Sequence, residues 1–294
     1  MSVGSRTIVI GARGQVGSAL LAQLGEHGAG ISRSDADITV RMELERALSA
    51  AGPVSALINA SAYNDVDGAE SNRDLAFAVN ADAPGWAAEW AAERNVPFVH
   101  YSTEYVFPDG AERPWRESDH PAPLNVYGES KLAGETAVLR AHSTSKVIRT
   151  SWVYSNSSNN FVRRVLQLAS NGNPLQMVSS QVGAPTYAPE LARATLLMAK
   201  NQHPQATENT GIFHLAGSGS VGRAEFAREI VRIGVAEGVL AKEVAVEEIE
   251  TSGYASPARR PINCVLDCAR TDALGIALPP WRESLVAAVQ AVRS

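Results

Sequence analysis

The segment GARGQVG, residues 11–17, limits the possible folds more than any other part of this sequence. It overlaps the end of the apolar run RTIVIGA (6–12), which is predicted to be a buried strand. It also opens QVGSALLAQLGE (15–26), whose apolar residues have helical spacing. Its three glycines permit a tight turn, close approach of backbone N–H groups to a pyrophosphate, and close packing of helix on strand. The helix N-terminus adds the positive end of its dipole, so the segment predicts a dinucleotide site.

Strand and helix patterns alternate through the first half of the chain. Further strands are predicted at residues 28–33, 54–60, 96–102 and 146–151, and helices at 41–52, 74–95 (bent at Pro84) and 127–141. Such alternation implies right-handed crossovers and a parallel sheet that helices cover on both faces. We therefore expect an α/β fold with a Rossmann-type, doubly wound parallel sheet.

The second half of the chain is less regular. Helices are predicted at 159–170, 189–200 and 223–234, a strand at 210–217, and an ordered loop at 251–267. We expect a dinucleotide-binding domain over residues 1–151, to which 178–217 returns. Residues 152–177 and 218–294 are expected to form a smaller, mostly C-terminal substrate-binding lobe.

The composition narrows the functional class. A net charge of −5 argues against a nucleic-acid partner, which would require a basic face. No apolar run approaches the roughly 18 residues of a membrane span, and the N-terminus lacks the layout of a signal peptide. Only two cysteines, Cys264 and Cys268, are present, which suits a reducing compartment, and no second Cys or His group stands nearby to complete a zinc site. We expect a cytoplasmic enzyme without a membrane contact.

The end of the second predicted strand bears on which dinucleotide binds. An acidic residue there would bind the ribose 2′-hydroxyl of NAD, whereas Ser or Arg suits the additional phosphate of NADP. The sequence ISRSDADI places Ser32, Arg33 and Ser34 at this position. NADPH is therefore the expected cofactor, with NADH as the alternative.

In the stretch YGESKLAGE (127–135), a tyrosine stands four residues before a lysine. On a helix, Tyr127 and Lys131 share one face, one turn apart. The positive charge would favour phenolate and lower the pKa of the tyrosine, which suits the proton donor of a carbonyl reductase. The alternative is an ordinary exposed pair on a surface helix, and the pair alone does not decide between the two.

Several motifs follow one another along most of the chain: GARGQVG, NASAYNDVDGAES, AVNADAP, HYSTEYVFPDG, PLNVYGESKLAGE, RTSWVYS, NNFVRRVL, QVGAPTY and SPARRPINCVLD. Together they resemble the extended short-chain dehydrogenase/reductase superfamily and, within it, the dTDP-4-dehydrorhamnose reductase family. The resemblance implies NADPH-dependent reduction of the 4-keto group of dTDP-4-dehydro-L-rhamnose. Two alternatives stay open, namely a 4-ketoreductase for another dTDP-deoxysugar and a non-catalytic NADP-binding regulatory subunit.

The same resemblance implies that Thr103, Tyr127 and Lys131 form the catalytic set. Thr103 ends a predicted parallel strand, where doubly wound sheets place their ligands, and its hydroxyl would hydrogen-bond the substrate carbonyl. Tyr127 would donate the proton, and Lys131 would hold the cofactor ribose and lower the pKa of Tyr127. Ser102 offers an alternative hydroxyl, but neighbouring residues of a strand point to opposite sides.

The resemblance also implies which other residues contact the two ligands. Around the cofactor it places Gly11, Arg13, Gly14, Gln15, Val16, Gly17, Ser32, Arg33, Asp37, Ile38, Ala60, Ser61, Ala62, Tyr63, Asn80, Tyr101 and Ser102. Around the sugar nucleotide it places Glu104, Tyr105, Val106, Trp152, Asn160, Phe161, Gln181, Val182 and Gly183. Arg259 and Arg260 are expected at the diphosphate, because guanidinium groups match phosphate oxygens.

Two positions depart from the family pattern. Glu104 stands where the family usually has Asp, which moves the carboxylate outward by one methylene group. Some members hold a divalent ion at a dimer contact through glutamates, and one of those positions is Ala19 here, so no metal is expected. The expected partner is a small-molecule nucleotide sugar, and the protein is expected to be a monomer or a homodimer.

Overall fold

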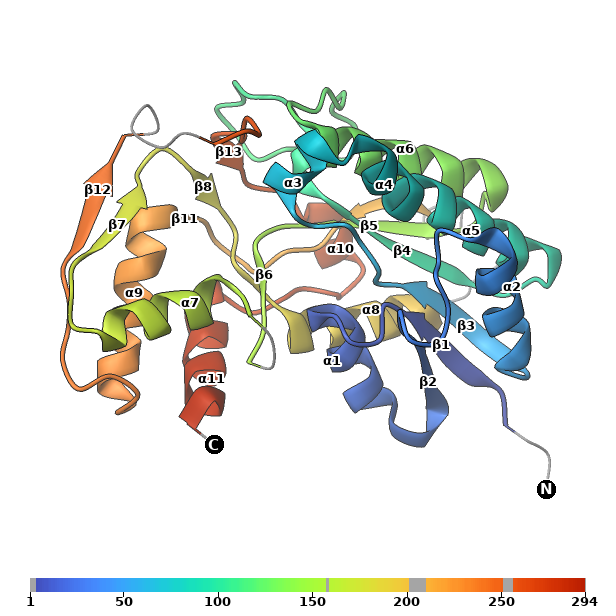
Figure 1. Ribbon diagram of the computed structural model, residues 1–294, viewed down its shortest axis with the longest axis horizontal. Helices are drawn as coiled ribbons and strands as arrows, with labels where there is room; N and C mark the ends of the chain where they lie inside the picture. Colours follow the sequence, from blue (N-terminus) through green and yellow to red (C-terminus); the bar gives the residue numbers. More distant parts are fainter. Residues whose placement is uncertain (1–3, 157–158, 201–209, 251–255, 294) are drawn as a thin grey trace.

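The computed structural model describes residues 4–156, 159–200, 210–250 and 256–293. Its centre is a sheet in the order β10-β5-β4-β3-β1-β2, and every neighbouring pair in it is parallel. The strands are β1 (Arg6–Ile10), β2 (Gly28–Ile31), β3 (Val54–Asn59), β4 (Phe98–Thr103), β5 (Lys146–Thr150) and β10 (Gly211–His214). The chain runs from β1 outward to β2 and then returns to β3 on the other side of β1 (Figure 1). This reversal confirms the predicted doubly wound sheet.

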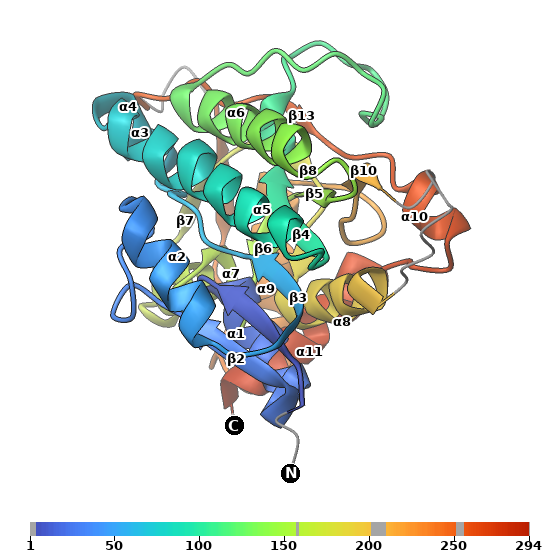
Figure 2. The ribbon, with the colours of Figure 1, turned by 90° about the vertical axis from the view of Figure 1, so that its right-hand side faces the viewer.

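Alternating side chains give each face of the sheet its own core. The covering helices are α1 (Gln15–Leu24), α2 (Arg41–Ala50), α5 (Ala83–Glu93), α6 (Val126–Ala141) and α8 (Ala188–Lys200). Ile8 and Ile10 pack with α2, α5 and α6 on one face, whereas Val9 packs with α1 and α8 on the other. Figure 2 shows these two helix layers with the sheet between them.

The helix predicted at 74–95 is interrupted. It consists of α4 (Arg73–Phe77), a π-helical turn η2 (Ala78–Asp82) and α5, with Pro84 in the first turn of α5. Proline has no N–H to donate to the carbonyl of Asn80, four residues earlier. That carbonyl lies against α6, because a Cβ built on Gly134 would be 2.0 Å from the Asn80 oxygen. The bend expected at Pro84 is therefore a π turn just before it.

Most remaining elements lie in the C-terminal part of the chain. They are β6 (Val153–Tyr154), α7 (Phe161–Ser170), β7 (Leu175–Val178), β8 (Val182–Gly183), β9 (Thr186–Tyr187), β11 (Val221–Gly222), α9 (Arg223–Ala236), β12 (Val246–Ile249), β13 (Asn263–Cys264), α10 (Ala269–Ala273) and α11 (Trp281–Arg293). Helices α7, α9 and α11 lie together (Figure 1). Their side chains form a further apolar cluster that contains Phe226. The division of the chain into domains stays a prediction.

Three short elements complete the fold: η1 (Gly25–His27), α3 (Val66–Ser71) and η3 (Glu104–Val106). Helices α3, α10 and α11 were not predicted. In α3 the segment VDGAES offers little apolar periodicity, and Asp65 begins the helix by accepting a hydrogen bond from the N–H of Gly68. Residues 251–255 of the predicted loop at 251–267 lie outside the described residues. Within the described ranges, no helix has both the length and the apolar character needed to cross a bilayer.

Candidate active site

A cavity of about 700 Å³ lies at the carboxyl ends of the central strands. This is where doubly wound sheets bind their ligands, at the point where the strand order reverses. Residues after β1, β2, β3 and β4 line it, together with the first turns of α6 and residues from the C-terminal half. Among the predicted site residues, it brings together Gly11, Arg13, Gly14, Gln15, Val16, Ser32, Arg33, Asp37, Ile38, Ala60, Ser61, Ala62, Tyr63, Tyr101, Ser102, Thr103, Glu104, Tyr105, Tyr127, Lys131, Trp152 and Phe161.

The glycine turn leaves bare backbone beside the cavity. Gly11 has a left-handed backbone (φ 82°), and a Cβ there would lie 2.6 Å from the backbone nitrogen of Ser61. A Cβ on Gly17 would lie 2.1 Å from the Gly11 oxygen, so Gly17 serves helix–strand packing and stands outside the described cavity lining. Gly14 precedes α1, and no described side chain caps that helix. This cradle fits the diphosphate of a dinucleotide.

Ser32, Arg33 and Asp37 line the cavity after β2, and the carboxylates of this segment are hydrogen-bonded within it. The Asp35 carboxylate there accepts hydrogen bonds from the hydroxyl and the N–H of Ser32, at 2.6 and 2.8 Å, which lower its pKa. Asp37 accepts from the hydroxyl of Thr39 at 2.7 Å, and this bond lowers its pKa. Arg33 is exposed beside the cavity, and it forms no ion pair with any described residue. The cavity lining after β2 therefore includes an exposed cation, as a site for the additional phosphate of NADP requires.

Thr103, Tyr127 and Lys131 meet in this cavity because α6 packs tightly on the turn after β4. Asn125 begins α6 by accepting a hydrogen bond from the N–H of Gly128 at 2.8 Å. A Cβ on Gly128 would lie 2.2 Å from the Tyr105 oxygen, so only glycine permits this approach. Tyr127 then packs edge-on against Tyr105, with ring centroids 5.5 Å apart.

The electrostatics of Tyr127 differ from the sequence prediction. Burial raises the pKa of the Tyr127 phenol, the nearby Glu104 carboxylate raises it further, and a hydrogen bond with the Thr103 side chain lowers it. A lowering by Lys131 was predicted, and it is not among the shifts found in the described structure. The prediction was wrong because helical spacing says nothing of burial, which disfavours the phenolate.

Lys131 is itself buried and anchored. Its Nζ donates a hydrogen bond to the main-chain oxygen of Tyr101 at 2.6 Å. Burial lowers the pKa of Lys131 to about 8, and the negative charge of Glu135, one turn further along α6, opposes that shift. The ammonium is therefore held beside β4 but retains its charge near neutral pH.

A buried polar layer supports this group from beneath. Glu135 Oε1 accepts from Arg149 Nε at 2.8 Å and from the hydroxyl of Ser102 at 2.5 Å, and Glu135 Oε2 accepts from Arg149 Nη2 at 2.6 Å. The side chains of Glu135 and Arg149 are each 2% exposed. Ser102 thus points to this layer while Thr103 bonds to Glu104, as the strand alternation predicted. The sequence reasoning missed Glu135 and Arg149, since nothing local pairs residues 14 positions apart.

Glu104 is the second titratable group with an unusual environment. Its side chain accepts a hydrogen bond from Thr103 Oγ1 at 2.8 Å, and the residue is 4% exposed. Burial raises the pKa of Glu104 to about 7, although the Thr103 hydrogen bond and the charge of Arg223 oppose the rise. At neutral pH this carboxyl is therefore close to half protonated.

Folding stability should depend on pH through Glu104. Because its folded-state pKa is raised above the unfolded value, its stabilising contribution is full below about pH 4.5 and is lost as the pH rises through about 7. In Glu104→Gln this pH dependence should disappear. The free energy of unfolding of the variant, relative to that of wild type, should therefore rise by up to about 3 kcal/mol between pH 4.5 and 8. Urea unfolding at several pH values measures this, and parallel curves for the two proteins would contradict it.

Other predicted residues lie outside the described cavity lining: Asn80, Val106, Asn160, Gln181, Val182, Gly183, Arg259 and Arg260. Asn80 holds the loop of a cavity residue instead, since its side chain bonds both the N–H (2.9 Å) and the oxygen (3.0 Å) of Tyr63. Val106 is fully buried in a core cluster. Asn160 begins α7 by accepting from the N–H of Arg163. Gly183 leaves room for the Trp152 ring, which would lie 2.4 Å from its Cβ.

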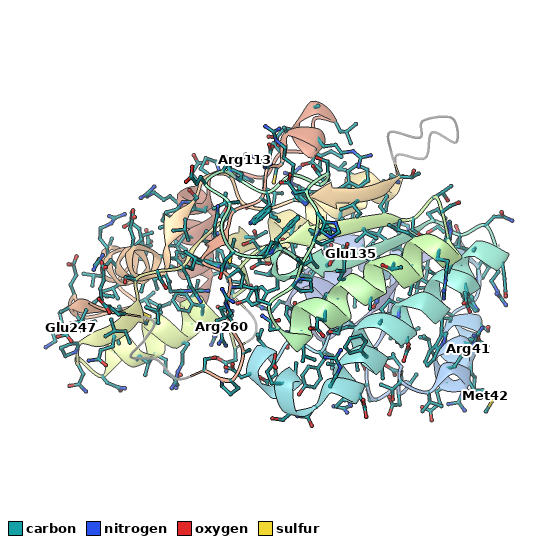
Figure 3. All side chains as sticks on the ribbon, turned by 90° about the horizontal axis from the view of Figure 1, so that it is seen from above. Arg41, Met42, Arg113, Glu135, Glu247 and Arg260 are labelled. Carbon is teal, nitrogen blue, oxygen red and sulfur yellow. The ribbon has the colours of Figure 1, made fainter. Side chains whose placement is uncertain are left out.

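The two arginines expected at the diphosphate, Arg259 and Arg260, form ion pairs with carboxylates of the protein. Arg260 forms a two-pronged pair with Asp67 of α3, at 3.1 and 2.8 Å, which lowers the pKa of Asp67 to about 2. Arg259 pairs with Asp109 at 2.9 Å and is largely exposed. Figure 3 shows Arg260 away from Glu135, toward the start of α6, where Asn125 Nδ2 donates to the Arg259 oxygen. The sequence prediction for these two residues finds no support here.

The cavity also contains residues that the sequence reasoning missed. They include Thr150, Val153, Tyr154, Arg223 and Phe226. Arg223 is the first residue of α9, and its guanidinium lies 3.6 Å from the centroid of the Trp152 ring. The helix predicted at 223–234 placed Arg223 at a helix start, but nothing in the sequence indicated that Arg223 faces the cavity.

Comparisons with known proteins agree with this geometry. A family model described as the RmlD substrate binding domain matches residues 5–294. Among curated relatives, the chain is similar to the dTDP-4-dehydrorhamnose reductase of Sinorhizobium fredii, with 38% identity over 283 residues and 95% of each chain covered. The Mycobacterium tuberculosis protein of the same name is 37% identical over 295 residues, covering 97% of this chain and 93% of that one.

Solved structures give the same result. The dTDP-4-dehydrorhamnose reductase of Clostridium acetobutylicum superposes with a TM-score of 0.90 at 30% identity, covering 98% of this chain and 100% of that one. The Bacillus anthracis protein, solved in complex with NADP, gives 0.89 at 29% identity over 97% and 99% of the two chains. From the match of the family model and of these relatives over nearly its whole length, this chain belongs to the RmlD substrate-binding domain family, that of the dTDP-4-dehydrorhamnose reductases.

Proposed function

We propose that the protein reduces the 4-keto group of dTDP-4-dehydro-L-rhamnose with NADPH to give dTDP-L-rhamnose. One observation carries this proposal: Thr103, Tyr127 and Lys131 converge in the cavity that also contains the glycine turn. A binding protein without turnover would not need a hydroxyl, a phenol and an ammonium in such an arrangement. Membership of the family supports the choice of substrate and cofactor.

Proton donation falls to Tyr127. The bound cofactor supplies hydride to the carbonyl carbon of the sugar. As negative charge develops on the carbonyl oxygen, Thr103 Oγ1 and the Tyr127 hydroxyl stabilise it by hydrogen bonds, and the Tyr127 proton moves to that oxygen. Burial of Tyr127 suits this role, because its raised pKa keeps the proton on the phenol until the oxygen becomes basic.

Lys131 acts by position and charge. The Tyr101 oxygen holds its Nζ beside β4, so the ammonium stays at the cavity that Tyr127 also lines. There it would hydrogen-bond a cofactor ribose. The pKa of Lys131 near 8 implies that activity falls as the pH rises beyond that value.

The direct test follows NADPH oxidation in the presence of dTDP-4-dehydro-L-rhamnose. Wild type should consume one NADPH for each sugar reduced and release dTDP-L-rhamnose, identified by mass and by NMR. A protein that binds NADPH but leaves this sugar unreduced would contradict the proposal. If the protein reduces a different dTDP-4-ketosugar faster, that sugar is the substrate instead.

Arg33 should select NADPH over NADH. In Arg33→Gln we expect the Kd for NADPH to rise about tenfold, as one charge-assisted hydrogen bond at a partly exposed site is lost, while the Kd for NADH stays constant. Fluorescence titration of both cofactors measures the two constants. Arg41→Gln, an exposed arginine that pairs with Glu45, is the matched control. Equal losses for both cofactors would rule out a role at the additional phosphate.

The protein is further proposed to be cytoplasmic and to contain a separate substrate-binding lobe. Cys264 and Cys268 are both free thiols, which supports a cytoplasmic location. The additional apolar cluster around Phe226 supports a C-terminal substrate-binding lobe beside the cofactor-binding sheet. We further propose that the protein works as a monomer or as a homodimer, which sedimentation at working concentration would distinguish.

A further inference from the structure

We propose that Arg223 binds the diphosphate of the nucleotide sugar, in place of Arg259 and Arg260. The inference rests on the proposed function, since it takes the sugar nucleotide to be the ligand of this end of the cavity. It assigns a substrate-binding role to the first residue of α9.

The cations of the described cavity lining are distributed unevenly. Arg13 and Arg33 follow β1 and β2, at the end of the cavity that fits the dinucleotide. Lys131 lies on α6 and donates to the Tyr101 oxygen. Arg223 is the described cation at the opposite end, among Trp152 and Phe161. A substrate whose ketone reaches Tyr127 must place its doubly charged diphosphate on the side away from the cofactor, where Arg223 stands.

Aromatic rings fix the Arg223 guanidinium but leave its hydrogen-bonding edge available. It stacks 3.6 Å from the centroid of Trp152 and 4.8 Å from that of Phe161. Such stacking covers the planar faces and uses none of the five N–H donors. Among the described residues, Gln181 Oε1 accepts one hydrogen bond from it at 3.4 Å, and no carboxylate lies within ion-pair distance. A planar, oriented fork of this kind suits two phosphate oxygens at once.

Arg223 also lacks a full counter-charge. Partial burial lowers its pKa, and the guanidinium remains charged because its ordinary pKa is so high. The titratable groups that act on it are Tyr105, Cys264, Glu104 and Arg260. Tyr105 and Cys264 are neutral near pH 7 because burial raises both pKa values, Glu104 is about half protonated there, and Arg260 is positive. A half-buried charge with so little compensation is stabilised by an anionic ligand.

The two alternative arginines are differently placed. The Asp67 carboxylate neutralises Arg260 in a two-pronged pair, and Asp109 pairs with Arg259, both outside the described cavity lining. For either to reach the substrate, an ion pair would have to break first. Arg223 requires no such exchange.

The test compares dTDP with thymidine, which has the same base and sugar but no phosphate. For Arg223→Gln we expect dTDP to bind about 10- to 100-fold more weakly than to wild type, while thymidine binding and the Kd for NADPH stay constant. Calorimetry measures dTDP and ligand-observed NMR measures thymidine. Arg232→Gln, an exposed arginine on the same helix that pairs with Glu229, is the matched control and should change neither.

Each outcome decides the inference. Equal weakening of dTDP and thymidine would mean that Arg223 only packs on Trp152, and selective loss of dTDP in Arg259→Gln or Arg260→Gln instead would return the role to those residues. If Arg223→Gln does not fold, Arg223→Lys replaces it in the test. A lysine offers a point charge instead of a planar fork, so dTDP should bind several-fold more weakly, and unchanged dTDP binding would overturn the inference. If the wild-type protein binds dTDP more tightly than thymidine but reduces no ketosugar, the proposed function is contradicted, whereas the diphosphate-binding role of Arg223 is retained.

Discussion

Tyr127→Phe should reduce kcat for ketosugar reduction by about 10²- to 10⁴-fold, the range for removal of a general acid. The variant loses only the phenolic hydroxyl, which faces the Thr103 side chain in the resting protein. The ring remains, so its edge-on packing against Tyr105 should be retained. The Kd for NADPH should change little, because the proposed cofactor contacts also include the glycine turn and the residues after β2. Single-turnover kinetics with excess enzyme would separate the proton-transfer step from product release.

Tyr187→Phe is the matched control. Tyr187 is buried against Tyr154 at a ring-centroid distance of 5.5 Å and lies outside the described cavity lining, so the same chemical change there should leave kcat within about twofold. Equal rates for Tyr127→Phe and wild type would remove the phenol from the mechanism. A parallel loss of NADPH binding would mean that Tyr127 serves the cofactor rather than the ketone.

The sequence predicted the sheet well because the relevant information is local. Ile8, Val9 and Ile10 alternate between two cores, and the glycine turn connects the strand to a helix within the first 25 residues. Both signals depend on residues that are neighbours in the chain. Helix α3 was missed since its six residues start from a side-chain cap rather than from an apolar stripe.

The site was predicted less completely, and the errors have a common cause. Arg260 pairs with a residue 193 positions away, and Arg149 with one 14 positions away. Arg223 reaches the cavity only because α9 packs beside Trp152. The pKa of Tyr127 depends on burial by other elements rather than on its spacing from Lys131. Motifs indicate which residues matter, whereas the charges that surround them come from the assembled fold.

Glu135→Gln should lower the free energy of unfolding by about 3–5 kcal/mol, the cost of leaving one partner of a buried ion pair without the other. The guanidinium of Arg149 stacks over Phe107 and is 2% exposed, so water cannot replace the lost carboxylate. The same change removes the negative charge that opposes the pKa lowering of Lys131. The loss of activity at alkaline pH should therefore begin at a lower pH in the variant. Urea unfolding and a pH–rate profile measure the two effects.

Two further variants distinguish the effect of breaking the buried ion pair from the general effect of removing a charge. Glu248→Gln breaks an exposed pair with Arg228, and it should cost less than about 1 kcal/mol. The double variant Glu135→Leu/Arg149→Met removes both charges, and it should recover much of the stability that Glu135→Gln loses, because no uncompensated ion remains. If the loss of unfolding free energy in the double variant equals the sum of the losses caused by its two single substitutions, Glu135 and Arg149 are not coupled. If its pH–rate profile matches that of wild type, Lys131 does not depend on the charge of Glu135.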